Sequence, residues 1–353
     1  MKRVIFLLIF LILTLSFAGC GKAVNETVSY GDVTNDVEKD APAPSEGLEF
    51  ELIEDGSAYA VIGMGECKDS DLVIPSEHLG KPVVAVSGSF EKCDLKSVYI
   101  PGSVKRIDGE EAFDECKSLE KVTLNRGLTY IGTYAFKKSF SLNEIEIPDT
   151  VVEIGKGAFK GSGIKKLVVP GSVKIIGEGA FGGLGNALEI TVSDGVEKIG
   201  REAFSTCKNL ETLTLPASVK EIGETAFEDC KALRNIYYTG DAGQWCMIDF
   251  ENEESNPISN FVKKGGLCFY LKGQMTVDVV IPDGTPEIKQ YAFSGAYGIK
   301  SVTIPESVTK IGRHALCEFP LENIYYKGSE EQWKKIEIGQ NDNFEGAKIS
   351  FAK

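Results

Sequence analysis

The chain has 353 residues and a formal net charge of −14, since 38 lysines and arginines face 52 aspartates and glutamates. An acidic chain without a basic stripe is a poor candidate for binding nucleic acid, heparin or an anionic lipid surface. Its nine cysteines include no C-x-x-C pair, the spacing shared by many zinc and redox sites.

Residues 1–19 are predicted to be an export signal. Two basic residues open the chain, and the apolar run from Val4 to Phe17 is too short for a permanent membrane span, which takes roughly 20 residues. The small residues before Cys20 resemble the lipobox of bacterial lipoproteins, with Phe17 where leucine is commonest. This resemblance implies cleavage before Cys20 and acylation of its thiol. The alternative is an ordinary signal peptide with an incidental cysteine.

Residues 20–47 are predicted to be the lipid anchor and a disordered tether. After Cys20 the segment has six acids, Pro42 and Pro44, and no apolar periodicity, so it cannot bury enough surface to fold. As a flexible coil it would hold the following domain on the order of 30 Å from the membrane.

From residue 48 onward the sequence repeats one apolar template about every 23 residues. One complete copy consists of Leu213, Leu215, Pro216, Val219, Ile222, Gly223, Ala226 and Phe227. Units with so short a period bury their apolar face only against their neighbours, so the chain is predicted to stack into a solenoid. That architecture shifts the expected function from catalysis toward binding.

Each copy of the template predicts one coil. The V-x-I alternation is typical of a short strand, the following proline ends the strand's hydrogen-bond ladder, and A-F-x-x-C is typical of a short helical or 3₁₀ return. Because successive strands run in the same direction, they are expected to form a parallel sheet. Eleven strands are predicted, ending at Ile74, Ile100, Leu124, Ile147, Val169, Val192, Leu215, Tyr238, Ile281, Ile304 and Tyr326.

Departures from the template predict caps. Residues 50–62 have two apolar runs around a polar turn, which is typical of a β-hairpin that covers the first coil. Asp241 and Ser329 each stand three residues before a glutamine, the capping-box spacing of a helix start. The tryptophans that follow, Trp245 and Trp333, are expected to pack back on the sheet edge.

These departures divide the folded chain into three parts. Residues 48–238 are predicted to form a first repeat array with its hairpin cap, residues 239–278 an irregular helix and hairpin insertion, and residues 279–353 a second array with its cap. The insertion is expected to end in a hairpin around residues 272–274. On this interpretation, the helix at each tryptophan closes one array, the first of eight coils and the second of three.

The repeat resembles that of the BspA-like leucine-rich repeat family, also called the Treponema pallidum type. A strand phrase ending in I-P is followed by V-x-x-I-G-x-x-A-F-x-x-C, and the match runs from Phe50 to Lys353, with Leu316 in place of one template phenylalanine. The resemblance implies a β-rich α/β leucine-rich repeat solenoid with a parallel sheet, short helical or 3₁₀ returns, and hairpin and helix caps. Members are typically secreted or surface-attached, and several are implicated in adhesion to host matrix proteins or other bacteria.

The template also accounts for most residues that suggest chemistry. Four cysteines share one template position, namely Cys93, Cys116, Cys207 and Cys230. Stacked free thiols are favoured there over disulfides between neighbouring coils. The G-x-G-x-x-G beginning at Gly177 consists of template positions and is not a phosphate loop. His78 and His314 belong to no zinc or nucleophile motif, so neither a metal nor another cofactor is expected.

The outward row of the predicted sheet is where binding specificity could lie. Exposed tyrosines on a rigid backbone make contact anchors of low entropy cost, although aromatic and β-branched residues also favour strands for reasons of packing alone. The sequence therefore predicts a face rather than a single site. Its candidate residues are Tyr99, Thr123, Glu146, Val168, Thr191, Thr214, Tyr237, Val280, Thr303 and Tyr325.

Together these features predict a non-enzymatic, monomeric surface protein that is lipid-anchored on the extracellular side of the bacterial cell envelope. Its partner is expected to be a host or bacterial surface protein or glycan, and it would touch the membrane only through its lipid. Two alternatives stay open. One is a surface hydrolase with a site in residues 239–278 that uses Asp249 or Glu251. The other is a passive envelope component without a dedicated ligand.

Overall fold

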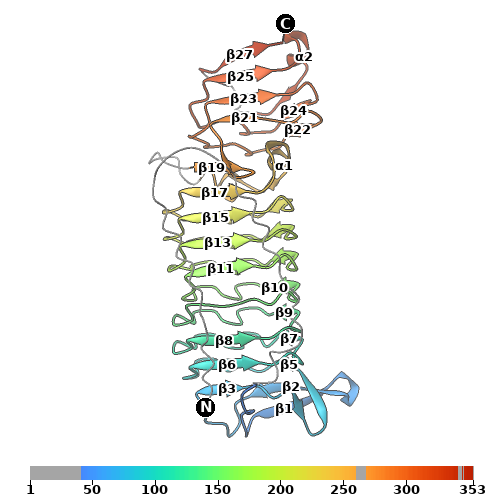
Figure 1. Ribbon diagram of the computed structural model, residues 1–353, viewed down its shortest axis with the longest axis vertical. Coiled ribbons are helices and arrows are strands. Elements are labelled where there is room, and N and C mark those ends of the chain that lie inside the picture. The colour runs from blue at the N-terminus through green and yellow to red at the C-terminus, as the bar shows by residue number, and fades with distance from the viewer. Residues whose placement is uncertain (1–40, 260–267, 341–343, 345, 353) are drawn as a thin grey trace, which may run out of the picture. The chain divides into compact units, whose positions relative to one another are not determined.

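The computed structural model describes residues 41–259, 268–340, 344 and 346–352. From Ala41 onward the chain forms one unit, in which short strands stack coil upon coil (Figure 1). The stacking begins within the predicted tether, because the Ser45 N–H donates to the carbonyl of Val73 at 3.0 Å and the Ser45 hydroxyl accepts from the Val73 N–H at 3.1 Å. The predicted export signal, Cys20 and most of the tether lie outside the described residues.

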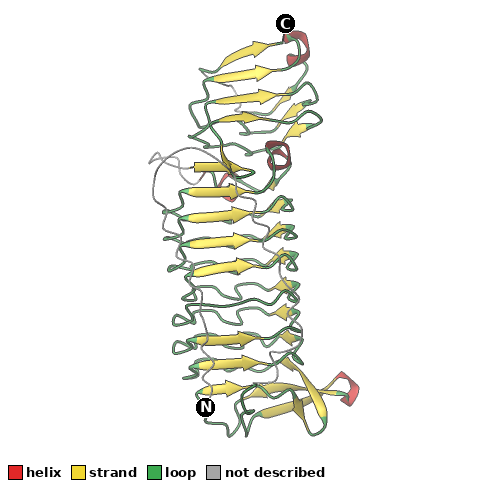
Figure 2. Cartoon of the chain, in the orientation of Figure 1, coloured by secondary structure: helices red, strands yellow, loops and turns green. Residues whose placement is uncertain are grey.

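The longer strands of the coils form three sheets, which we call the broad sheets (Figure 2). Neighbouring strands in them run parallel, except the final pair β19 and β20, so the predicted parallel sheet is confirmed. The first comprises β3 (Asp71–Val73), β6 (Ser97–Ile100) and β8 (Lys121–Leu124); the second β11 (Lys166–Val169), β13 (Glu189–Val192), β15 (Thr212–Leu215), β17 (Asn235–Tyr238), β19 (Cys268–Leu271) and β20 (Gln274–Met275); the third β21 (Asp278–Val280), β23 (Ser301–Ile304), β25 (Asn323–Tyr326) and β27 (Lys348–Phe351).

Burial alternates along the broad strands as the V-x-I pattern predicts. In β15, Leu213 and Leu215 are buried, whereas Thr214 between them is half-buried. Ten of the eleven predicted strand phrases form strands, and β19, β20 and β27 are additional members that the template did not predict. Strands β19 and β20 pair antiparallel, which confirms the hairpin predicted around residues 272–274.

The narrow sheets lie on a second side of the coils, and from β7 onward each of their strands has only two residues. The long one runs through β1 (Glu49–Ile53), β2 (Ala58–Gly63), β5 (Lys81–Val86), β7 (Arg106–Ile107), β9 (Tyr130–Ile131), β10 (Glu153–Ile154), β12 (Ile175–Ile176), β14 (Lys198–Ile199), β16 (Glu221–Ile222) and β18 (Asp249–Phe250), and the other consists of β22 (Glu287–Ile288), β24 (Lys310–Ile311) and β26 (Glu337–Ile338). The glycine after these short strands lets the coils approach. A Cβ on Gly200 would lie 2.8 Å from the carbonyl oxygen of Ile176 in the preceding coil, so a larger residue does not fit.

The predicted N-terminal hairpin is confirmed. Strands β1 and β2 pair antiparallel, joined by the 3₁₀ turn η1 (Glu54–Gly56), and β2 then pairs parallel with β5. A second small hairpin joins β4 (Glu77–His78) to β5. The rings of Phe50 and His78 stack with their centroids 3.7 Å apart. This histidine therefore packs within the N-terminal cap.

A continuous column of phenylalanine rings fills the middle of the stack. The rings are buried, and the centroids of successive rings are 5.1 to 5.6 Å apart with interplanar angles of 17° or less. The column consists of Phe90, Phe113, Phe136, Phe159, Phe181, Phe204 and Phe227. Each turn also bonds to the next coil, as when the Phe181 N–H donates to the carbonyl of Ala203 at 2.8 Å. The A-F pair therefore supplies both the core and the hydrogen bonds between coils.

The four cysteines at the template position, Cys93, Cys116, Cys207 and Cys230, are free thiols, as predicted. The Cys116 thiol donates to the carbonyl of Phe90 at 3.1 Å, and Cys230 donates to Phe204 at 3.2 Å. Burial raises the pKa of Cys116 to about 12, which keeps the thiol protonated and poorly reactive at neutral pH.

One predicted strand does not form. Residues 144–147 have no strand partner, although Ile147 is buried and Glu146 is exposed as the alternation predicts. The first and second broad sheets are therefore separate, and this coil lies between them.

Both predicted capped helices are confirmed. Helix α1 (Ala242–Cys246) has a complete capping box between Asp241 and Gln244, and α2 (Glu330–Trp333) has one between Ser329 and Gln332. Helix α1 does not close the first array, however. Strand β19 pairs with β17 and strand β18 pairs with β16, so both kinds of sheet continue past the helix.

Candidate functional site

The strand register gathers most of the predicted outward residues into ladders. In the second broad sheet, Thr191 lies between Val168 and Thr214, and Thr214 is next to Tyr237. In the first, Tyr99 pairs with Thr123, and in the third Thr303 lies between Val280 and Tyr325. Nine of the ten predicted residues are therefore distributed over three separate sheets, and Glu146 lies in the coil between the first two.

All ten predicted residues have surface exposure. Glu146, Val168, Val280 and Tyr325 are exposed, and the other six are half-buried by their ladder neighbours. Glu146 is the sole charged member of the predicted set. The outward rows thus present apolar, hydroxyl and aromatic groups rather than a field of one charge.

The second sheet adds a residue that the sequence interpretation missed. Tyr270 of β19 pairs with Tyr237, and their rings stack with centroids 4.3 Å apart at 17°. Burial raises the pKa of Tyr270 to about 12, so its hydroxyl remains a proton donor at neutral pH. The signal was present in the sequence, because Phe269 points inward and Tyr270 outward in the same V-x-I alternation.

Polar groups at the starts of the broad strands pair across neighbouring coils. In the second sheet Lys166 and Glu189 form an ion pair with an N–O distance of 3.1 Å, and in the third sheet the Ser301 hydroxyl donates to Asp278 at 2.6 Å. These groups therefore satisfy one another.

The carboxylates proposed for a hydrolase have structural partners. Asp249 pairs with Lys289, with an N–O distance of 2.7 Å, and Glu251 accepts a hydrogen bond from the Glu224 N–H at 2.9 Å. An open hollow of about 430 Å³ lies beside α1, lined by residues including Asp241 and Thr285. Asp241 caps the helix and pairs with Lys272, so its carboxylate serves the turn.

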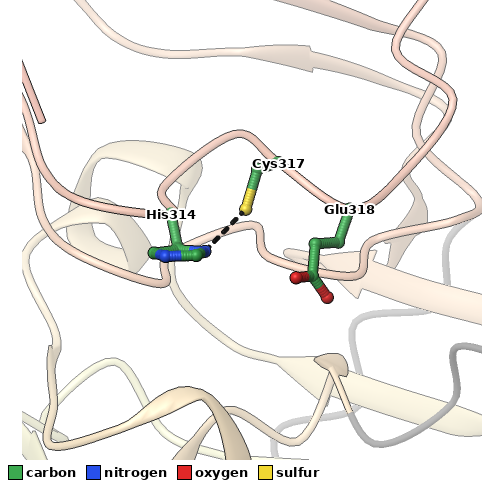
Figure 3. Close-up of side chains that lie close together, drawn as sticks. All are labelled: His314, Cys317 and Glu318. Carbon is green, nitrogen blue, oxygen red and sulfur yellow. Dashed lines mark hydrogen bonds between the residues drawn. The ribbon is translucent and has the colours of Figure 1, made fainter. Parts of the chain in front are cut away.

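His314 lies in a chemically richer position than the sequence indicated. It is half-buried, and its Nδ1 lies 3.3 Å from the thiol sulfur of Cys317 (Figure 3). The ring stacks on Tyr291 with centroids 5.8 Å apart. The predicted motifs gave no role to either His314 or Cys317.

In the part of the chain that the structure describes, no helix has the length and apolar character needed to cross a bilayer. The predicted lipidation residue, Cys20, lies outside those residues.

The comparisons with known proteins concern the repeat. The model of the BspA type leucine rich repeat region matches in six copies, over residues 86–183, 152–252 and 265–345. Similar solved structures include a leucine rich repeat protein of T. pallidum, 26% identical over 59% of this chain and 85% of that one (TM-score 0.43), and a leucine rich cell surface protein of Faecalibacterium prausnitzii, 22% identical over 85% and 98% (TM-score 0.34). The pneumococcal vaccine antigen PcpA is 18% identical over 88% of each chain (TM-score 0.40).

Among curated proteins, none matches the sequence. The family model nevertheless matches well over half of the chain, in the region where the template residues form the stacked coils. This chain therefore belongs to the BspA-type leucine-rich repeat proteins.

Proposed function

We propose that this protein binds a macromolecular ligand through the outward row of its second broad sheet, as a non-enzymatic, monomeric protein of the bacterial cell surface. The ligand would be a protein or glycan of a host or of another bacterium. One observation carries the proposal: the continuous ladder of Val168, Thr191, Thr214, Tyr237 and Tyr270, which ends in the stacked tyrosine pair.

Rigidity makes this ladder suitable for recognition. The hydrogen-bonded backbone of five neighbouring strands fixes the row, and at a strand spacing of about 4.8 Å it extends for roughly 20 Å. Tyrosine side chains have few rotatable bonds and combine a large apolar ring with a hydroxyl, so ordering them on binding costs little entropy. Glycans and extended peptides offer the complementary apolar faces and hydroxyl or amide groups.

A binding experiment tests this proposal. The full chain would be presented to a panel of extracellular matrix proteins, mucins and bacterial surface glycans, and its affinity for the best ligand compared with that of the double variant Tyr237→Ser and Tyr270→Ser. We expect the double variant to bind at least about tenfold more weakly, because clustered interface tyrosines are frequent hot spots.

Tyr130→Ser is the matched control, since Tyr130 is a half-buried tyrosine of narrow strand β9. It should bind as the unmodified chain does. Absence of binding across the panel by the folded chain would favour a passive envelope role. Equal losses in the double variant and in Tyr130→Ser would place the interface elsewhere.

We further propose that a lipid on Cys20 anchors the protein to the extracellular side of the envelope, as the small residues preceding Cys20 suggest. Expression of the full chain with labelled palmitate should label the unmodified protein and not a Cys20→Ala variant. Cys268→Ala, which removes a half-buried thiol of β19, is the control and should keep the label. Unchanged labelling of Cys20→Ala would exclude this anchor.

A further inference from the structure

Three different metal-ligating side chains converge at one turn of the C-terminal coils. One ligand atom each from His314, Cys317 and Glu318 lies within 4.8 Å of the other two (Figure 3). The closest pair is His314 Nδ1 and Cys317 Sγ, at 3.3 Å. An imidazole, a thiol and a carboxylate thus meet at one turn, in which His314 and Cys317 are half-buried and Glu318 is exposed.

The template backbone explains this convergence. His314 and Glu318 occupy the two positions of the turn with positive φ, 57° and 63°, which recur in other coils, as at Glu111 and Glu115. The turn between them is therefore held by the fold, whatever its side chains. The ring of Tyr291 in the preceding coil stacks on His314 and restrains the imidazole.

A fourth potential ligand comes from a distant part of the sequence. Glu253 begins the 3₁₀ turn η2 (Glu253–Ser255), and its carboxylate accepts a hydrogen bond from the Ser294 hydroxyl at 3.0 Å. The same hydroxyl lies 3.9 Å from the Cys317 sulfur. Ser294 therefore places the Glu253 carboxylate on the side of the turn where the thiol lies.

From this arrangement we infer that His314, Cys317, Glu318 and Glu253 form a binding site for one zinc-like divalent cation. Thiolate and imidazole ligands favour zinc or cobalt over magnesium or calcium, which prefer oxygen ligands alone. Around a tetrahedral zinc ion, ligand atoms at about 2.0–2.3 Å from the metal are separated by roughly 3.3–3.8 Å. For His314, Cys317 and Glu318, whose ligand atoms lie within 4.8 Å of one another, this requires side-chain shifts of only about 1 Å.

Binding would follow a simple proton balance. The cation forms a bond to the Cys317 sulfur as the thiol proton leaves to solvent. It would also tie η2, in residues 239–278, to the coil that contains His314. The ion would then act as a clamp between the irregular segment and the last coils, a role separate from ligand binding on the broad sheets.

Cobalt titration of the reduced, metal-free full chain tests the site. We expect one equivalent of Co²⁺ to give a thiolate-to-cobalt charge-transfer band that zinc abolishes by displacement. Cys317→Ser should lose the band, and His314→Gln should weaken zinc binding at least about 100-fold, because even outer-shell changes weaken metal sites 10- to 100-fold. Glu253→Gln should weaken it at least about tenfold if this carboxylate is a ligand.

The chain supplies matched controls. Cys268→Ser and His78→Gln remove a half-buried thiol and the only other histidine, and both should leave cobalt and zinc binding unchanged. Circular dichroism would confirm that each variant is folded. A folded chain that gives no charge-transfer band, or a band that survives in Cys317→Ser, would overturn the site. Unchanged zinc affinity of Glu253→Gln would refute the fourth ligand.

Discussion

Replacing Phe204 with alanine is expected to lower the free energy of unfolding by about 3–5 kcal/mol, the usual cost of removing a buried phenylalanine. The ring is fully buried, with its centroid 5.6 Å from that of Phe181 and 5.5 Å from that of Phe227. Both neighbouring rings are fixed by their own coils, so they cannot collapse into the cavity. Urea unfolding followed by circular dichroism measures the loss.

Phe140→Ala is the matched control for this prediction. Phe140 lies outside the column and is 52% exposed, so its replacement should change the free energy of unfolding by no more than about 0.5 kcal/mol. A loss below about 1 kcal/mol for Phe204→Ala would show that the column does not carry the stability of the stack. Equal losses for the two variants would lead to the same conclusion.

The repeat made the fold predictable because one physical requirement recurs in every coil. A position that must be buried against the coils before and after it, such as Phe181, has nearly the same surroundings in each copy. A position that must come close to the preceding backbone, such as Gly200, accepts only glycine. The template therefore encoded the strands, the turns and the core before any contact was known.

Features that depend on register between coils were less predictable. The phrase ending at Ile147 has the same apolar alternation as the others, yet residues 144–147 form no strand, and the alternation alone does not distinguish them. Tyr270 was missed for a related reason. Its place beside Tyr237 follows from the pairing of β19 with β17, across an insertion that the template does not describe.

The candidate metal site was hidden from sequence reasoning by distance along the chain. Glu253 is 61 residues before His314, and its position depends on the path of the irregular segment. Asn256 helps to hold that path, since its side-chain amide donates to the carbonyls of Tyr291 and Ala292 at 2.6 and 3.1 Å. Such contacts are specific to one insertion and leave no periodic signal.

Replacing Trp245 with alanine is expected to produce the second large effect, a loss of about 3–5 kcal/mol together with a less cooperative unfolding transition. The indole of α1 is fully buried, and its N–H donates to the carbonyl of Ala292 at 2.6 Å. It also contacts Tyr238 and Phe269, with ring centroids 5.0 and 4.7 Å away. Trp245 thus joins the second broad sheet to the coil of Ala292.

Two further variants separate packing from hydrogen bonding. Trp245→Phe keeps much of the ring and removes one of two donors to the Ala292 carbonyl, which still accepts from Asn256, so a smaller loss of about 0.5–1.5 kcal/mol is expected from the hydrogen bond. Trp333→Ala removes the corresponding residue of α2, which packs on Tyr326 in the last coils. Because coils contact only their neighbours, the effect of Trp333→Ala should be confined to the C-terminal end.

Hydrogen exchange shows which part of the chain loses protection in each variant. Trp245→Ala should raise exchange on both sides of α1. Protection lost only beyond residue 279 would contradict the role of Trp245 in joining the two parts.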